Sequence, residues 1–419
     1  MNVKLNEFKK IITSPVILSL LIIFIFFNFF IIFENSFCRA ELKVLNNIVS
    51  KFGYKIDKET LENFKNYYDE RLKEMNEITY KKTSRTYESA SEFFQYKNHE
   101  SNVYSKDDME FFKNLSIEEG YYFTARNIDS IYNKIDIIQI AEGEIKKYNF
   151  SGKAAEIVRS EYKSFNKRFN ELIKNEEHKN LFFMGNTYRM HSLLFKDLFR
   201  SFIFEIIILS VLVTGYSVNY EFDNSTQLLA YSTKRGRNLI KDKLLSSIFA
   251  NLITATLIIS TGIMAYFTTF NYSGLWNIPI SSYFNAEYNH PYMSKWNMTF
   301  IQYLICGIVI IYILTFLFTG ITFVISRYMK NSYIVFFIFA TVFSGALVLS
   351  SFLPTNSSAV FIGGFTPFML SMNSSFWFME SGAFATFKYY ELIIVLMWTT
   401  IMIISNILSI KSFKKIDIS

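Results

Sequence analysis

The residues best suited to catalysis form no catalytic or metal-binding motif in this sequence. There is no HExxH, CxxC or GxSxG pattern, and no two of the four histidines have metal-ligand spacing: His99, His178, His191 and His290. The nearest approach to a phosphate-binding P-loop is Gly152-Lys153, but Lys147 and Ala154 stand where a glycine and a serine or threonine are required. We therefore expect no catalytic residue, no metal site and no cofactor site in this chain.

Two acidic residues stand inside long apolar runs, where a charged side chain is costly and usually functional. Glu205 lies in the run 199–219 and is either an interfacial residue near Arg200 or part of a substrate path. Glu391 lies near one end of the run 389–410, where we expect an interfacial position. An intramembrane enzyme would gather several acids, histidines or a nucleophile at the ends of such runs, and the sequence offers no such cluster.

The most patterned polar stretch is 220–243, which joins two apolar runs. It reads YEFDNSTQLLAYSTKRGRNLIKDK, with acids first, then a short apolar turn, and then a basic turn around Gly236. We expect a short helix from about Thr226 to Tyr231 that lies across the membrane face. The alternative is an ordinary basic loop, which accounts for the lysines and arginines but not for the preceding acids or the LLAYS segment.

Six long apolar runs must position these residues. A bilayer core about 30 Å thick is crossed by roughly 20 apolar residues of helix. Backbone groups in hydrocarbon need partners within their own segment, so each run is a helix rather than a strand. The sequence predicts an all-α membrane protein with six transmembrane helices and one large polar insert at 34–198. The runs are 16–33, 199–219, 244–270, 299–326, 332–353 and 389–410.

The distribution of charge predicts the orientation of these helices. The insert holds 27 Lys+Arg and 27 Asp+Glu, so the whole net charge of +7 lies outside it. The excess basic residues flank the spans on one side, which marks the cytoplasmic face: Lys4, Lys9, Lys10, Lys234, Arg235, Arg237, Lys241, Lys243, Arg327, Lys330, Lys411, Lys414 and Lys415. We expect a multi-pass plasma-membrane protein with both termini inside and residues 34–198 outside. Nucleic acid is excluded as a partner, because these charges sit beside membrane spans.

The insert is predicted to be helical. Asp57 has the position of an N-cap, and Ser105 to Asp108 and Ser116 to Glu119 resemble capping boxes. Amphipathic helices at about 128–147 and 153–177 suggest an antiparallel hairpin. Their aromatic stripes form either a domain core or a surface for an outer partner. The two cysteines, Cys38 and Cys306, lie in different parts of the chain, so we expect no disulfide between them.

Two further segments adjoin the membrane. Residues 1–13 have Leu5, Phe8 and Ile12 at helical spacing among lysines, which predicts an amphipathic helix in the inner interface ahead of the first span, 14–33. The apolar segment 361–387 is broken by Gly363, Gly364 and Pro367. It is either a re-entrant element on the outer side or a loop on the headgroups that is anchored by Trp377. Residues 411–419 are expected to form a cytoplasmic tail.

On these features the chain resembles the permease subunits of type-2 ATP-binding-cassette (ABC) exporters that carry a large outer domain after the first span. In that family, the loop after the second span runs from an acid through Gly-Thr and a leucine-rich turn to an arginine and a lysine. Ser225 stands here where the family usually has glycine. The matching positions are Glu221, Thr226, Leu228, Leu229, Ser232, Arg235 and Lys243.

The resemblance implies a half-transporter. Two permeases, identical or different, would work with two separate ATP-binding ABC subunits, which would hold the ATP and magnesium. Residues 220–243 would be the coupling loop, and Gly363, Gly364 and Pro367 would belong to an outer gate. The substrate would be amphipathic or hydrophobic, such as a peptide, a lipid or a drug-like molecule, and an antimicrobial peptide is one candidate. The alternatives are a membrane-anchored receptor or scaffold, whose outer domain binds a ligand, and a lipid-modifying enzyme.

Overall fold

The computed structural model describes residues 3–96, 103–184, 192–233, 236–287 and 290–415. In these ranges the regular secondary structure is helical apart from one antiparallel pair of two-residue strands, β1 (Ala286–Glu287) and β2 (His290–Pro291). Six of the helices are long and apolar enough to cross a membrane. The expectation of an all-α chain with six candidate spans is therefore confirmed.

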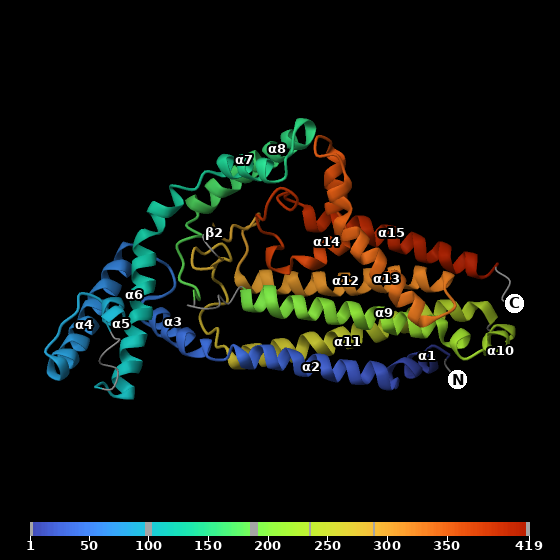
Figure 1. Ribbon diagram of the computed structural model, residues 1–419, viewed down its shortest axis with the longest axis horizontal. Coiled ribbons are helices and arrows are strands. Elements are labelled where there is room, and N and C mark those ends of the chain that lie inside the picture. The colour runs from blue at the N-terminus through green and yellow to red at the C-terminus, as the bar shows by residue number, and fades with distance from the viewer. Residues whose placement is uncertain (1–2, 97–102, 185–191, 234–235, 288–289, 416–419) are drawn as a thin grey trace.

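The six candidate spans form one bundle, in which the first four run side by side along the long axis of the molecule and the fifth is inclined to them (Figure 1). The second span is central, because α9 packs against α2, α11, α12 and α13. The spans are α2 (Pro15–Glu34), the π-helix η2 (Ser192–Leu198) with α9 (Phe199–Asp223), the 3-10 turn η3 (Gly236–Asn238) with α11 (Leu239–Thr269), α12 (Phe300–Tyr328), α13 (Ser332–Val348) with η4 (Leu349–Phe352), and α15 (Tyr390–Phe413).

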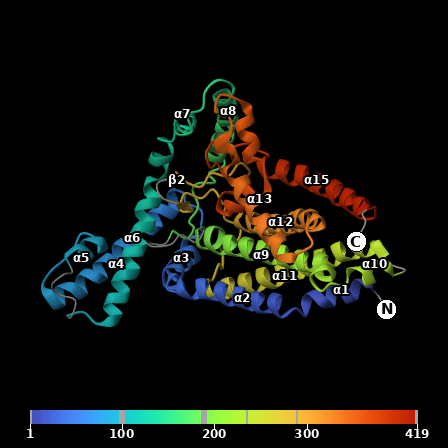
Figure 2. The ribbon, with the colours of Figure 1, turned by 45° about the vertical axis from the view of Figure 1, so that its right-hand side comes forward.

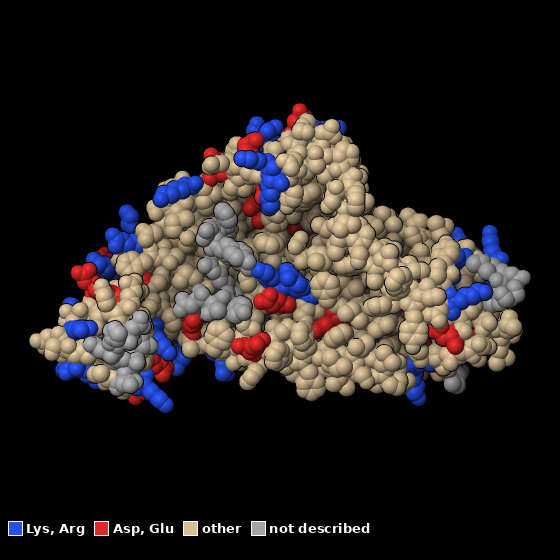
Figure 3. Space-filling view, viewed as in Figure 1, with Lys and Arg blue, Asp and Glu red and all other residues tan. Residues whose placement is uncertain are grey.

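The bundle has two different ends, which we call the termini side and the insert side. Helix α1 (Val3–Ile12), helix α10 (Gln227–Ser232) and the end of α15 lie at the termini side (Figure 1). The helices of the insert lie at the other end. The surface over the spans in between is mostly uncharged, whereas charged side chains gather over the insert and at the termini side (Figure 3).

The second span is longer than its apolar run. It starts at Ser192, so the last seven residues of the polar insert are part of a membrane helix. The sequence hides this continuity because Lys196 and Asp197 interrupt the apolar pattern. Leu193, Leu194 and other residues of the same turns are nevertheless completely buried.

The insert is built from α3 to α8 and divides into two parts (Figure 2). Its helices are α3 (Cys38–Phe52), α4 (Lys58–Thr83), α5 (Ala90–Tyr96), α6 (Lys106–Tyr132), α7 (Ile137–Lys147) and α8 (Gly152–Lys174). Helices α4 to α6 extend away from the bundle, whereas α7 and α8 arch over the beginning of α15 (Figure 2). Helices α7 and α8 pack against each other, as expected for a hairpin.

Two predicted caps in the insert are confirmed, and one is wrong. Asp57 accepts a hydrogen bond from the Thr60 amide, and Ser105 and Asp108 form a reciprocal capping box. Ser116 lies inside the continuous helix α6, because Leu115, Glu118 and Glu119 are buried and hold this stretch in the core. The predicted helix over 128–147 is also divided, since the Asp136 carboxylate caps a new helix at Ile138 and Gln139.

Helix α1 forms where it was expected, but it packs with a different face. Its buried residues are Glu7 and Ile11, whereas Leu5 is exposed. The helix lies against α11 and α9. Lys10 forms ion pairs with Glu7 of its own helix and with Glu221 of α9, so this face turns inward, which the apolar pattern alone could not indicate.

The broken segment before α15 is packed into the protein. It contains η5 (Ser358–Gly364), α14 (Pro367–Met372) and η6 (Ser374–Phe376), and α14 contacts α9, α12, α13 and α15. The side chain of Trp377 is only 2% exposed and donates its indole N–H to the Leu370 carbonyl. The alternative of a surface loop anchored by Trp377 is therefore wrong. Irregular backbone at this depth is tolerated because protein surrounds it.

Candidate functional site

The short helix α10 presents an apolar pair at the termini side. Leu228 is 64% exposed and Leu229 is 74% exposed. Tyr231 of the same helix is buried, and its ring lies 5.3 Å from the ring of Phe413 and 6.0 Å from that of Phe222. Helix α10 is therefore fixed to the bundle by an aromatic contact while two leucines stay uncovered.

The turn before α10 requires an unusual backbone conformation. Ser225 has a φ of 55°, in the left-handed region that glycine adopts without steric cost. The Thr226 amide donates to the Glu221 carbonyl at 2.8 Å and closes the turn. This geometry explains why glycine suits the position that Ser225 occupies here.

Four charged side chains, of which three are buried and Lys10 is half-buried, form what we call the ionic cluster: Glu7, Lys10, Glu221 and Lys243. The Lys243 ammonium is fully buried and donates to Glu221 Oε2 and to the Ser217 carbonyl, the latter at 2.5 Å. The Lys10 ammonium donates to Glu221 Oε1 at 3.2 Å and to Glu7 Oε1 at 2.9 Å. Two carboxylates thus compensate two ammonium groups, and α1, α9 and α11 are joined at one point.

Charges of the cluster shift the pKa values of two groups outside the spans, its own member Lys10 and the neighbouring Tyr231. Burial opposes the charged form of Lys10, but the carboxylates of Glu7 and Glu221 outweigh it and raise the Lys10 pKa above its ordinary value. The pKa of Tyr231 is also raised, by burial first and then by Glu221 and Glu7. Lys10 therefore stays positively charged and Tyr231 stays neutral at physiological pH.

The structure thus brings most of the singled-out loop residues together. Glu221 and Lys243 are in contact, and Thr226, Leu228 and Leu229 form the adjoining turn and helix. Arg235 lies outside the described residues. The region outside helices is shorter than 220–243, since α9 continues to Asp223 and α11 begins at Leu239.

At the insert side, Glu205 is buried between two spans. Its carboxylate accepts hydrogen bonds from the Asn28 amide at 2.7 Å and from the Ser201 hydroxyl at 2.8 Å. Glu205 is 4% exposed and Asn28 is 1% exposed. Glu205 therefore faces α2 and is held between the first and second candidate spans.

Gly363, Gly364 and Pro367 belong to the packed segment before α15. A Cβ atom on Gly363 would lie 2.7 Å from the Ser350 backbone nitrogen, so only glycine allows η5 to approach η4 this closely. Pro367 occupies the first turn of α14, and Thr366 caps that helix. These residues shape a tight corner of the bundle at the insert side.

Glu391 is also buried, in the first turn of α15. Its partner is the Lys295 ammonium, which lies 3.1 Å from Glu391 Oε1 and donates to the Ala385 and Phe387 carbonyls as well. Burial lowers the pKa of Lys295, and the carboxylate of Glu391 opposes that effect. The pair ties the loop between α11 and α12 to the first turn of α15.

The insert is hydrogen-bonded to the same corner. The Tyr162 hydroxyl of α8 donates to Glu380 at 2.6 Å, and the Ala383 amide donates to Glu144 of α7 at 3.2 Å. Burial, followed by the charge of Glu380, raises the pKa of Tyr162. The hairpin α7–α8 therefore holds the segment that precedes the last span.

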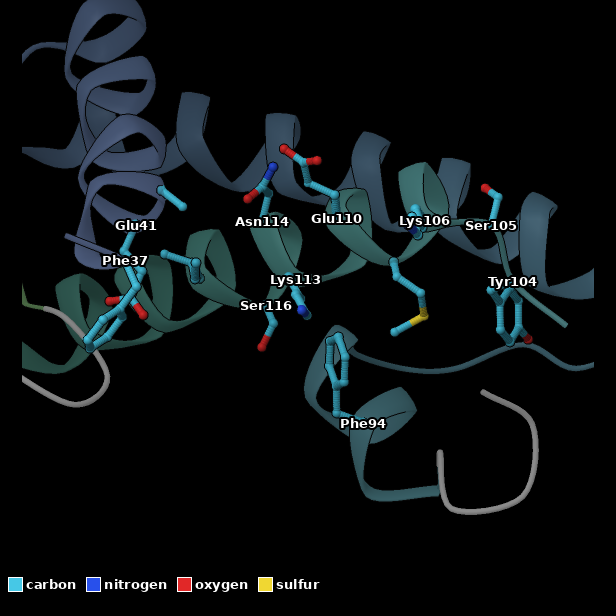
Figure 4. A pocket seen from close by; sticks show the side chains of 13 residues that line it. Phe37, Glu41, Phe94, Tyr104, Ser105, Lys106, Glu110, Lys113, Asn114 and Ser116 are labelled. Carbon is cyan, nitrogen blue, oxygen red and sulfur yellow. The ribbon is translucent and has the colours of Figure 1, made fainter. Parts of the chain in front are cut away.

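The insert also contains the largest cleft among those described, with a volume of about 970 Å³. Figure 4 shows it between α3, α5 and the first turns of α6. Apolar side chains such as Phe37 and Phe94 share the wall with Lys106, Glu110 and Lys113. The cleft is amphipathic and has no charge excess that would select one kind of ion. Among the described residues, no group of three His, Cys, Asp or Glu is placed to hold a metal.

Comparison of the chain with protein-family models, with curated proteins and with solved structures finds no match. The function is therefore argued from the site itself. Sequence reasoning missed Lys10, Asn28, Ser201 and Lys295 as partners of the acids that it did select, and it missed Glu7 as the second partner of Lys10. Asn28 offered a signal, because it is an amide inside the otherwise apolar run before Glu34.

Proposed function

We propose that this chain is the permease subunit of a type-2 ABC exporter. In this proposal it carries an amphipathic or hydrophobic substrate across the bacterial plasma membrane, and separate ATP-binding subunits supply the energy. Two permeases, identical or different, complete the transporter. The observation that carries the proposal is the exposed Leu228–Leu229 pair on a short helix whose preceding turn is hydrogen-bonded to Glu221 of the ionic cluster.

In this proposal, α10 transmits force from the ATPase to the spans. An ATPase that binds the two leucines would push on α10, and α10 is fixed to the bundle through Tyr231 and Phe413. The ionic cluster joins α1, α9 and α11, and α9 is the central helix of the bundle. A displacement at α10 would therefore move the second and third spans as one body.

The proposed orientation follows from charge. The basic residues Lys10, Arg237 and Lys414 belong to the termini side, and the positive-inside rule assigns that side to the cytoplasm. The insert and its amphipathic cleft would then be extracellular. Such a position suits a domain that meets a substrate or a partner outside the cell.

To test the proposal, the chain is purified from cells that produce it, and the proteins that co-purify are examined for an ATP-binding subunit. We expect the wild-type chain to retain an ATP-binding subunit and Leu228→Ser/Leu229→Ser to lose it, because two uncovered leucines supply the apolar contact. Phe352→Ser, an exposed position at the other end of the bundle, is the matched control. Equal capture by all three chains would contradict the assignment of α10.

A membrane-anchored receptor is the second candidate, and the cleft in the insert favours it. It predicts ligand binding by the insert without any ATPase partner. Loss of function after substitution in the cleft, with unchanged function of the Leu228→Ser/Leu229→Ser chain, would select the receptor over the transporter.

A further inference from the structure

A carboxylate in the membrane part of this protein has no cationic partner. Glu205 accepts hydrogen bonds from Asn28 and Ser201, and no Lys, Arg or His among the described residues lies within ion-pair distance of it. The buried acids Glu221 and Glu391, by contrast, each have an ammonium partner. A charged carboxylate at membrane depth is costly without a compensating group, so the position of Glu205 needs a reason.

Glu205 also lines a groove between α2 and α9. The groove has a volume of about 560 Å³, and its walls are mainly apolar: Ile23, Phe24, Phe27, Ile31, Phe204 and Ile208. Ile23 and Phe27 are exposed, so the groove opens on the face of the bundle that lipid would cover. Asn28, the partner of Glu205, lies six residues before Glu34. Because a helix rises about 1.5 Å per residue, this pair is about 9 Å from the insert-side end of α2.

The polar groups of the groove indicate the charge of a ligand, as its walls indicate the ligand's shape. The charged residues that line the groove are Asp197, Arg200 and Glu205, so the lining carries one excess negative charge. The Asn28 carbonyl oxygen is buried beside Glu205 and has no hydrogen-bond donor. Both groups are acceptors, and they would be satisfied by an ammonium or guanidinium group with N–H donors.

From this combination we infer that the groove between α2 and α9 binds an amphiphile with one cationic nitrogen head and an apolar body. The head contacts Glu205, and the body lies along the apolar walls and enters sideways from the membrane. This ligand class would narrow the substrate of the proposed transporter. Only the statement that the ligand is transported rests on the proposed function. Binding itself needs no ATPase, so its failure and the failure of the proposed coupling are separate results.

The experiment uses the full chain in nanodiscs of zwitterionic lipid and a dodecylamine that carries a photoreactive diazirine. Mass spectrometry measures labelling of α2 and α9, in competition with unlabelled dodecylamine, dodecanol or dodecyl sulfate. Empty nanodiscs define partition into lipid. We expect dodecylamine to compete at concentrations at least about tenfold lower than dodecanol, the ratio that one charge-assisted hydrogen bond supplies.

Glu205→Gln keeps the shape and the hydrogen-bonding capacity but removes the charge. We expect it to abolish the preference for the amine while a photoreactive dodecanol still labels the groove, which shows that the groove is intact. Glu205→Asp must retain the preference, and Glu34→Gln, an exposed position on α2, must leave it unchanged. The inference is overturned if the wild-type chain does not prefer the amine over dodecanol, or if Glu205→Gln prefers it equally. Glu205 would then serve only as a contact between the two helices.

Discussion

The pair of Glu221 and Lys243 predicts a specific pattern of stability changes. In Glu221→Gln the Lys243 ammonium stays fully buried but loses its counter-charge. Removal of one partner of a buried pair costs about 3–5 kcal/mol. Lys243 keeps the Ser217 and Val218 carbonyls as acceptors, and Lys10 keeps Glu7, so we expect the lower limit of about 3 kcal/mol.

The double variant Glu221→Gln/Lys243→Met should be more stable than Glu221→Gln alone. It removes the orphaned ammonium, and the remaining pair of Glu7 and Lys10 is neutral. We expect the double variant to lose about 1 kcal/mol of stability relative to the wild-type chain. Compared with the loss of about 3 kcal/mol in Glu221→Gln, this is a coupling of at least about 2 kcal/mol between the two sites. Lys241→Met, at an exposed position two residues away, should change stability by less than about 0.5 kcal/mol.

Intrinsic tryptophan fluorescence during heating is a suitable assay. All four tryptophans, at positions 276, 296, 377 and 398, lie outside the insert and report on the membrane half. At about 2 °C per kcal/mol, Glu221→Gln should melt about 6 °C below the wild-type chain and the double variant about 2 °C below it. Additive losses in the double variant would refute the buried pair, because independent sites do not rescue each other.

Three further predictions concern other contacts. Tyr162→Phe removes the hydrogen bond to Glu380 and should lower the free energy of unfolding by about 1–3 kcal/mol. Hydrogen exchange of the backbone amides in residues 380–386 should become faster. Unchanged exchange would show that α8 does not hold this segment. Ser225→Gly should preserve ATPase capture, whereas Ser225→Val should lose it, because a β-branched residue is disfavoured at a φ of 55°; equal capture by both would contradict the left-handed turn. Burial lowers the pKa of His178 from 6.5, so between the native pKa and 6.5 the unfolded chain binds the proton and the folded chain does not. The stability from this group is complete above 6.5 and is lost as the pH falls through that window, so circular dichroism melts should depend less on pH in His178→Gln; an unchanged dependence would exclude His178 as its source.

The helical elements were largely predictable because each follows from a local pattern. The six spans are long apolar runs, and the short helix after Thr226 has polar flanks and an apolar centre. The predicted start of the second span failed where two charged residues interrupt the apolar pattern. Lys196 and Asp197 ended the apolar pattern in the sequence, but the helix continues through them.

The pairings could not be predicted, because they join residues that are far apart in the chain. Lys10 and Glu221 are separated by 211 residues, and Asn28 and Glu205 by 177. Each of these side chains has a simpler local interpretation, as a topology signal, an amide in an apolar helix or an interfacial acid. Only the packing of α1 and α2 against α9 shows which partners meet.

Photo-crosslinking from position 229 in intact bacterial cells tests the proposed function most directly. With a photoreactive residue in place of the exposed Leu229, we expect an adduct with a cytoplasmic ATP-binding subunit, and none from a residue in the insert such as Tyr80, which is also exposed. An adduct with an ATPase from position 80, or labelling of position 229 by a reagent that cannot cross the membrane, would contradict both the docking site and the orientation.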